Sequence, residues 1–103
     1  MALKPADLHI LLALSKAPLH GYGLMKEVEA ESSGEVRLEL GSLYRLLARL
    51  MDEGLIRPSS AADRRRMYAL TPRGRAALED ETRRLADLVK LMRSRHLLKE
   101  AGR

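Results

Sequence analysis

The chain has 103 residues, of which 46% are hydrophobic and 3% aromatic, and its formal net charge is +5. This length supports one small domain, and the apolar content excludes a disordered chain. Cysteine is absent, which excludes disulfides, thiolate metal sites and thiol catalysis. No signal-peptide pattern occurs, and no apolar run approaches the roughly 20 residues of a membrane span. We therefore expect a cytoplasmic protein without membrane contact.

Basic residues are concentrated in the second half of the chain. Residues 1–53 carry 6 basic and 8 acidic groups, whereas residues 54–103 carry 13 basic and 6 acidic groups. A positive field confined to one region is typical of a protein with a polyanionic partner. From charge alone, a merely solvated basic surface is an equally good interpretation.

Apolar spacing predicts a mainly α chain with four helices, over residues 5–17, 21–31, 42–53 and 72–98. Proline at positions 5 and 72 suits a first helical turn, and Thr71 is a suitable N-cap. Ser42 or Gly41 begins the third helix, and Gly54 is placed to end it.

The remaining segments are predicted to be extended. Residues 35–40 alternate between polar and apolar side chains, which indicates a short extended segment. Strands at 55–58 and 64–70, joined by a polar tip at 59–63, predict a β-hairpin with a basic returning arm. Tyr68 is expected to pack inward from this arm.

Four short motifs stand out along the chain: His20-Gly21-Tyr22-Gly23-Leu24, Gly41-Ser42-Leu43-Tyr44, Gly54-Leu55-Ile56 and Tyr68-Ala69-Leu70-Thr71-Pro72-Arg73-Gly74. Together they resemble the PadR family of bacterial transcriptional regulators, over roughly residues 6–90. The resemblance implies a winged helix-turn-helix of three helices and a two-stranded wing, followed by a long dimerisation helix. Residues 1–71 would form the DNA-binding unit and residues 72–103 the dimerisation helix of the same compact body.

The same resemblance implies a homodimeric repressor that binds a pseudo-palindromic operator in double-stranded DNA. Its third helix would enter the major groove and its wing would lie along the backbone. Relatives that bind flat hydrophobic drugs use aromatic residues at the dimer centre, and the last helix here has none. A small-molecule effector therefore has no support in the sequence, and no cofactor is expected.

Candidate DNA contacts are outward polar residues near the start of the second helix, on the third helix and on the wing. Arginine can bind guanine with two hydrogen bonds or clamp a phosphate, and hydroxyls can bind phosphate oxygens. The candidates are Tyr22, Ser42, Tyr44, Arg45, Arg49, Arg64 and Arg65. For the two tyrosines a packing role stays open, and the arginines could be solvated only.

The fourth helix repeats apolar residues with a 3.5-residue period, which is typical of a helix seam between two chains. The first helix is apolar on an unusually wide face. The expected dimer contacts are Leu8, Leu11, Leu12, Leu78, Leu85, Leu88, Val89 and Met92.

An enzyme is not expected, because no phosphate-binding glycine loop, nucleophile–base pair or paired carboxylates occur. The three histidines are far apart in the sequence, so a metal site is not expected either. The alternative function is a winged-helix module that binds protein or RNA without operator specificity. Arg45 and Arg49 favour the DNA-binding regulator, since a protein-docking surface is usually more apolar.

Overall fold

A computed structural model describes residues 2–59 and 66–98 of the chain. Within these residues the elements follow the predicted order of three helices, a hairpin and a long helix. They are α1 (Pro5–Leu14), β1 (Leu19–His20), α2 (Gly21–Glu31), α3 (Leu40–Asp52), β2 (Ile56–Ser59), β3 (Met67–Leu70) and α4 (Pro72–Ser94).

Several element boundaries differ from the prediction. α1 ends at Leu14 rather than residue 17, and α4 ends at Ser94 rather than residue 98. α3 begins at Leu40, with Glu39 at the N-cap position and no side-chain capping bond, so neither Ser42 nor Gly41 starts it. Leu40, the last residue of the predicted extended segment, already belongs to α3, whereas Glu39 before it is extended.

The sheet has one strand more than the predicted hairpin. Its antiparallel order is β1-β3-β2, with Leu19 opposite Tyr68, His20 opposite Met67, and Ile56 opposite Leu70. β1 is too short to show an alternation pattern. It forms because the extended passage into α2 runs along the edge of β3, which would otherwise leave its N–H and C=O groups unpaired. This pairing joins the base of the wing, which comprises β2, β3 and their connection, to the start of α2.

The core lies between the three short helices and the sheet. Leu43, Leu47 and Leu50 form the buried stripe of α3, and Tyr68 is buried as predicted. Leu11 is also fully buried in this core, which corrects its assignment to the dimer interface: it has no surface left for a second chain.

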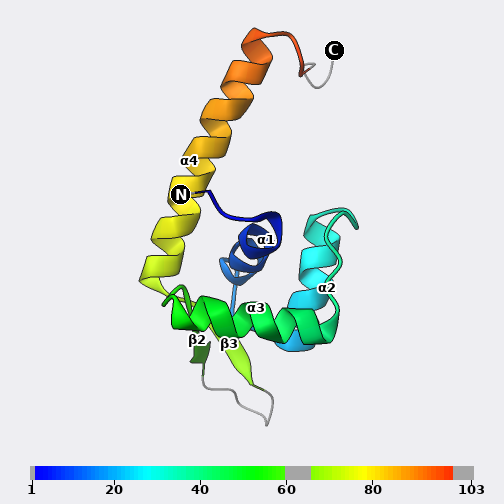
Figure 1. The fold of residues 1–103 in the computed structure, drawn as a ribbon, viewed down its shortest axis with the longest axis vertical. Helices are drawn as coiled ribbons and strands as arrows, with labels where there is room; N and C mark the ends of the chain where they lie inside the picture. Colours follow the sequence, from blue (N-terminus) through cyan, green and yellow to red (C-terminus); the bar gives the residue numbers. More distant parts are fainter. Residues whose placement is uncertain (1, 60–65, 99–103) are drawn as a thin grey trace.

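The start of α4 is attached to the end of α3. Gly54 follows α3 with a φ of 77°, which confirms the predicted glycine stop. The Thr71 hydroxyl accepts a hydrogen bond from the Gly74 N–H at 2.9 Å, which confirms the predicted N-cap, and it donates to the Gly54 carbonyl at 2.6 Å. From this root α4 runs past α1 and leaves the body of the molecule (Figure 1).

The C-terminal part of α4 has no packing partner in the described part of the chain. The buried residues of α4 are Gly74, Leu78 and Glu81, all in its first half. Beyond them Leu88, Val89, Leu91 and Met92 are exposed, although they are large and apolar. No described helix is both long enough and apolar enough to span a bilayer.

Candidate nucleic-acid interface

α3 presents a polar face opposite its leucine stripe. Tyr44 and Arg45 are exposed on this face, in the first turns of the helix. Arg45 Nη2 donates to Ser42 Oγ at 3.2 Å, so the guanidinium lies over the helix start. The first amides of α3 have no partners four residues earlier in the helix. Together these groups form a set of hydrogen-bond donors at one helix end.

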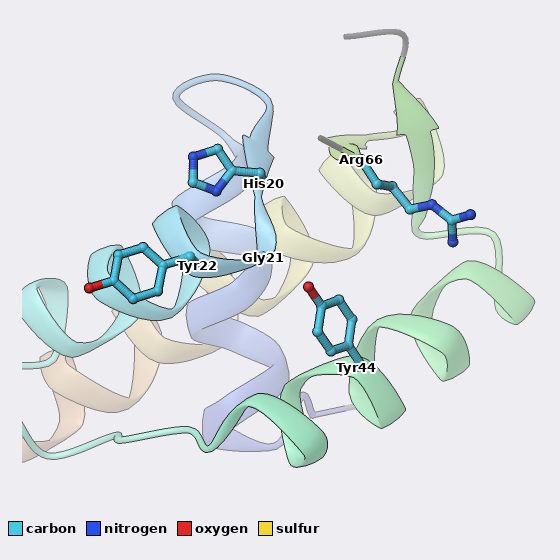
Figure 2. Close-up of a pocket in the computed structure, with 5 residues that line it drawn as sticks. All are labelled: His20, Gly21, Tyr22, Tyr44 and Arg66. Carbon is cyan, nitrogen blue, oxygen red and sulfur yellow. The ribbon is translucent and has the colours of Figure 1, made fainter. Parts of the chain in front are cut away.

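An open pocket of about 420 Å³ adjoins this helix start. It is lined by His20, Gly21, Tyr22, Tyr44 and Arg66, and we call it the tyrosine pocket. Figure 2 shows that its walls come from the start of α2, from α3 and from the residue preceding β3. Residues from three separate parts of the sequence therefore meet in one depression.

Gly21 is what allows Tyr44 to lie across the start of α2. A Cβ atom at position 21 would be 2.6 Å from Tyr44 Oη, so the Tyr44 side chain would have to shift. The Tyr44 hydroxyl points toward Gly21 in Figure 2. Tyr44 is nonetheless about half exposed, so its ring can both pack on α2 and contact a ligand.

The N-terminus of α2 is capped by the side chain of His20, the residue that precedes the helix. His20 Nδ1 accepts a hydrogen bond from the Gly23 N–H at 3.2 Å. Tyr22 is exposed, and Lys26 Nζ lies 5.2 Å from the centre of its ring. The Tyr22 hydroxyl and the Lys26 ammonium are thus close together on α2, and both can donate to an anion.

Six carboxylates of the described residues form ion pairs with cations of the chain. Glu27 pairs with Lys16 at 2.9 Å, and this contact lowers the pKa of the Glu27 carboxyl. By contrast, no carboxylate of the described residues lies within 4.0 Å of Arg45 or Arg66. Within residues 2–59 and 66–98, the guanidinium groups of Arg45 and Arg66 are therefore not neutralised by a carboxylate.

Arg49 is placed differently from Arg45. Its Nη2 donates to Asp7 Oδ1 and Oδ2 at 2.7 and 2.8 Å, and its Nη1 donates to Glu53 Oε1 at 2.9 Å. Hydrogen bonding to Asp7 raises the pKa of the Arg49 guanidinium above its usual value. Arg49 is thus exposed like Arg45, but two carboxylates of the chain engage its guanidinium.

Two features of the interface were not indicated by the sequence pattern. Arg66 lines the tyrosine pocket because β1 pairs with β3, and β1 was not predicted. Asp7 partners Arg49, and the available signal was an acid in the first turn of an otherwise apolar helix. Arg64 and Arg65, the expected wing contacts, lie outside the described residues.

A second, apolar depression runs between α1 and α4. This α1–α4 groove measures about 650 Å³, and Leu88 and Met92 are exposed on α4 near it. Leu78 lies at its base but is already mostly covered by the chain itself. Its lining residues are Leu8, Leu12, Leu78, Thr82, Leu85, Ala86, Val89, Lys90 and Arg93.

Residues 10–80 match the family described as the transcriptional regulator PadR-like family. The chain is 43% identical over 88 residues to an uncharacterised 37.1 kDa protein in a transposon of Streptomyces fradiae, covering 85% of this chain and 25% of that protein. It is 36% identical over 86 residues to a transcriptional regulator of Mycobacterium tuberculosis, covering 81% of this chain and 78% of that one.

Among solved structures, the fold is similar to that of Bacillus subtilis PadR in complex with operator DNA. The TM-score is 0.63 at 28% sequence identity, covering 75% of this chain and 46% of that chain. The chain thus spans about a quarter of the Streptomyces protein and less than half of the Bacillus protein. The likeness confirms the predicted winged helix-turn-helix class.

Proposed function

This chain belongs to the PadR-like family of transcriptional regulators, and from that premise we propose that it is a dimeric repressor. It binds a pseudo-palindromic operator through α3, which we call the recognition helix. Members of this family are transcriptional regulators rather than enzymes. Its partner is double-stranded DNA in the cytoplasm.

The observation that carries this proposal is the set of unneutralised donors around the start of α3. Arg45 supplies a planar guanidinium that can bind the O6 and N7 atoms of a guanine. Tyr44, Tyr22 and Ser42 supply hydroxyls, and Arg66 supplies a charge, for the phosphates on either side. A recognition helix uses its N-terminal residues in this way when it enters the major groove.

Dimerisation is supported by the α1–α4 groove and the exposed apolar end of α4. Leu8, Leu12, Leu85, Val89 and Met92 would meet a second copy there. Leaving apolar surface in water costs about 25 cal/mol per Å². A two-fold dimer also presents two recognition helices, which suits an operator with two inverted half-sites. In this arrangement residues 1–71 read DNA and residues 72–103 join the copies.

The operator experiment selects duplexes bound by the purified protein from a random library of duplexes about three helical turns long. The selected duplex and a shuffled duplex of equal composition are then compared in a gel-shift titration. An inverted repeat in the selected sequences, bound far better than the shuffled duplex, supports the proposal. Equal retention of both duplexes and of RNA would instead support the alternative module without operator specificity.

Arg45→Ala tests the base reader within the same titration. Removing one bidentate hydrogen-bonded pair should cost about 1–3 kcal/mol on the selected duplex and much less on the shuffled one. Arg83→Ala is the matched control, because it removes the same charge from an exposed site on α4. Equal reductions in affinity on both duplexes for Arg45→Ala would make Arg45 a phosphate-binding residue, with base reading left to Tyr44 or DNA shape.

Arg64 and Arg65 remain sequence-based predictions for the wing. Replacing both by Ala should weaken binding to any DNA, because phosphates carry no sequence information. The slope of log K against log salt should fall by about 0.9 for each phosphate that the variant no longer neutralises. An unchanged slope and unchanged affinity for the shuffled duplex would remove these residues from the interface.

A further inference from the structure

We infer that Arg49 is a positioning residue: it holds the recognition helix on α1 through Asp7 and does not itself contact the operator. The inference rests on the proposed function, because it assigns a role within operator recognition by α3. It removes one of the two arginines that the sequence suggested as DNA contacts and gives it a different task.

The first support is the geometry of the ion pair. Arg49 Nη2 reaches both oxygens of Asp7, at 2.7 and 2.8 Å, and Nη1 is engaged by Glu53 at 2.9 Å. Both terminal nitrogens of the guanidinium are therefore occupied by carboxylates of the chain. A contact of Nη1 and Nη2 with the edge of a base would require Arg49 to give up both carboxylates, because Asp7 and Glu53 already accept from these two nitrogens.

The second support is the burial of Asp7. Its side chain is only 7% exposed, whereas that of Arg49 is 44% exposed. A carboxylate removed from water is costly unless a cation compensates it, and removing the partner of such a pair is strongly destabilising. Arg49 is the cation that compensates Asp7, so its release toward DNA would leave a buried charge unpaired.

The third support is the position of the pair in the fold. α1 and α3 each pack more extensively against α2 than against one another. The Asp7–Arg49 pair joins residues 42 positions apart and bridges these two helices directly. Since Nη2 contacts both oxygens of Asp7, the pair fixes the distance between this point of α3 and the start of α1.

The consequence concerns the dimer. Asp7 is followed in α1 by Leu8, which lines the α1–α4 groove together with Leu12. One face of α1 therefore holds the recognition helix while another lines the proposed dimer interface. Operator half-sites lie about 34–36 Å apart, so the two recognition helices need a defined spacing and angle. The Asp7–Arg49 pair therefore holds the recognition helix in a fixed position relative to α1 and the groove that α1 lines.

The test uses Asp7→Asn, for which the two roles of Arg49 predict opposite results. Removing an acid frees Arg49, so a DNA-contacting Arg49 would bind both duplexes as well as or better than before. A positioning Arg49 instead predicts that preference for the selected over the shuffled duplex falls about tenfold, within the range for coupled neighbours. Unchanged or increased preference in the folded variant overturns the inference.

Glu53→Gln is the matched control. It removes the same charge from the same guanidinium, but Glu53 is half-exposed and directly follows α3, so it does not bridge to α1. Its preference should stay within about twofold of the wild type, as expected for an exposed pair. A reduction equal to that of Asp7→Asn would show that net charge, and not positioning, is responsible, which overturns the inference.

Arg49→Gln keeps the inference testable if Asp7→Asn does not fold. With a positioning role, the salt slope on the shuffled duplex stays at the wild-type value, whereas a phosphate-binding role predicts that the slope falls by about 0.9. Thermal melts set each assay temperature below the transition of the variant.

If the wild type itself binds both duplexes equally, the proposed function has failed and this inference fails with it. If the wild type prefers the operator and Asp7→Asn leaves that preference unchanged, the proposed function stands and only this inference is overturned.

Discussion

α3 and α4 each carry an apolar stripe, but the stripe of α3 is buried whereas most of the stripe of α4 is exposed to solvent. In α3, Leu43, Leu47 and Leu50 are essentially inaccessible to solvent. In α4 the stripe is buried only at its start, and Val89 and Met92 remain nearly 40% exposed. The helices also differ in place: α3 lies across the body, whereas α4 spans 23 residues and extends beyond it (Figure 1).

The difference shows that an apolar stripe predicts that a helix face is covered, without saying by which chain. The apolar stripe of α3 packs against α2 and the sheet of its own chain, so the opposite face of α3 is free to bind a polar ligand. The apolar side chains in the second half of α4 are not covered by the described residues, so we propose that a second copy of the chain covers them. Four changes, ordered from the largest expected effect, test this contrast.

Leu85→Glu combined with Val89→Glu should convert the dimer to a folded monomer. Burying an aliphatic side chain of this size contributes about 1.5–3 kcal/mol, and both copies of a symmetric pair would forgo it at both positions. Light scattering at micromolar concentration measures the mass, and circular dichroism verifies the helices. Ala76→Glu with Ser94→Glu adds the same charge elsewhere on α4 and should leave the dimer intact. A monomeric wild type would contradict the proposed interface.

Leu47→Ala should destabilise the chain at every protein concentration. Leu47 is fully buried in α3, and such truncations cost about 2–5 kcal/mol in the free energy of unfolding. Urea denaturation measures the change. Leu97→Ala, at a position 73% exposed, should change stability by less than about 0.5 kcal/mol. Similar destabilisation by both variants would mean that the α3 stripe is not the core.

Gly74→Ala should displace the root of α4. A Cβ atom at this position would lie 2.0 Å from the Leu55 carbonyl oxygen, which is backbone and cannot move aside alone. Overpacking of this kind costs about 1–3 kcal/mol. Gly41→Ala in α3 is the matched control: nothing lies within 4 Å of its Cβ position, so alanine should be neutral or slightly stabilising there. A thermal melt of both variants compares the two helices directly.

Glu81 should give the smallest effect, visible as a pH dependence of stability. Hydrogen bonds from Arg84 at 2.8 and 2.7 Å lower the pKa of this buried α4 carboxyl below its ordinary value of 4.5, and the Leu3 backbone N–H acts in the same direction. The stabilisation is therefore complete above the unfolded-state pKa and is lost as pH falls through the lower folded-state pKa.

Denaturation of wild type and Glu81→Gln at neutral and acidic pH measures this dependence. The stability difference between the two proteins should shrink below about pH 4. Glu31→Gln should show the opposite sign, because burial raises the pKa of Glu31 and its ionised form is disfavoured in the fold. A stability difference for Glu81→Gln that is constant across pH would remove the carboxylate from this role.

Local rules predicted much of the fold because the responsible groups are adjacent in the sequence. The bounds of α2, the Thr71 cap and the glycine stop at Gly54 depend on neighbouring residues. β1 and the tyrosine pocket could not be predicted in the same way. β1 exists because β3 returns beside it, and the pocket needs Tyr44 and Arg66 to be brought to Gly21.

The two arginines of α3 show which features follow from local sequence patterns and which depend on the tertiary structure. Sequence spacing by itself determined that both lie off the leucine stripe, because helical periodicity is a local property. Only the tertiary structure decided that Arg49 meets a buried carboxylate 42 residues away, while Arg45 meets none among the described residues. Side-chain partners across such a separation depend on how helices pack, since the cost of burying Asp7 is set by surroundings that distant parts of the chain provide.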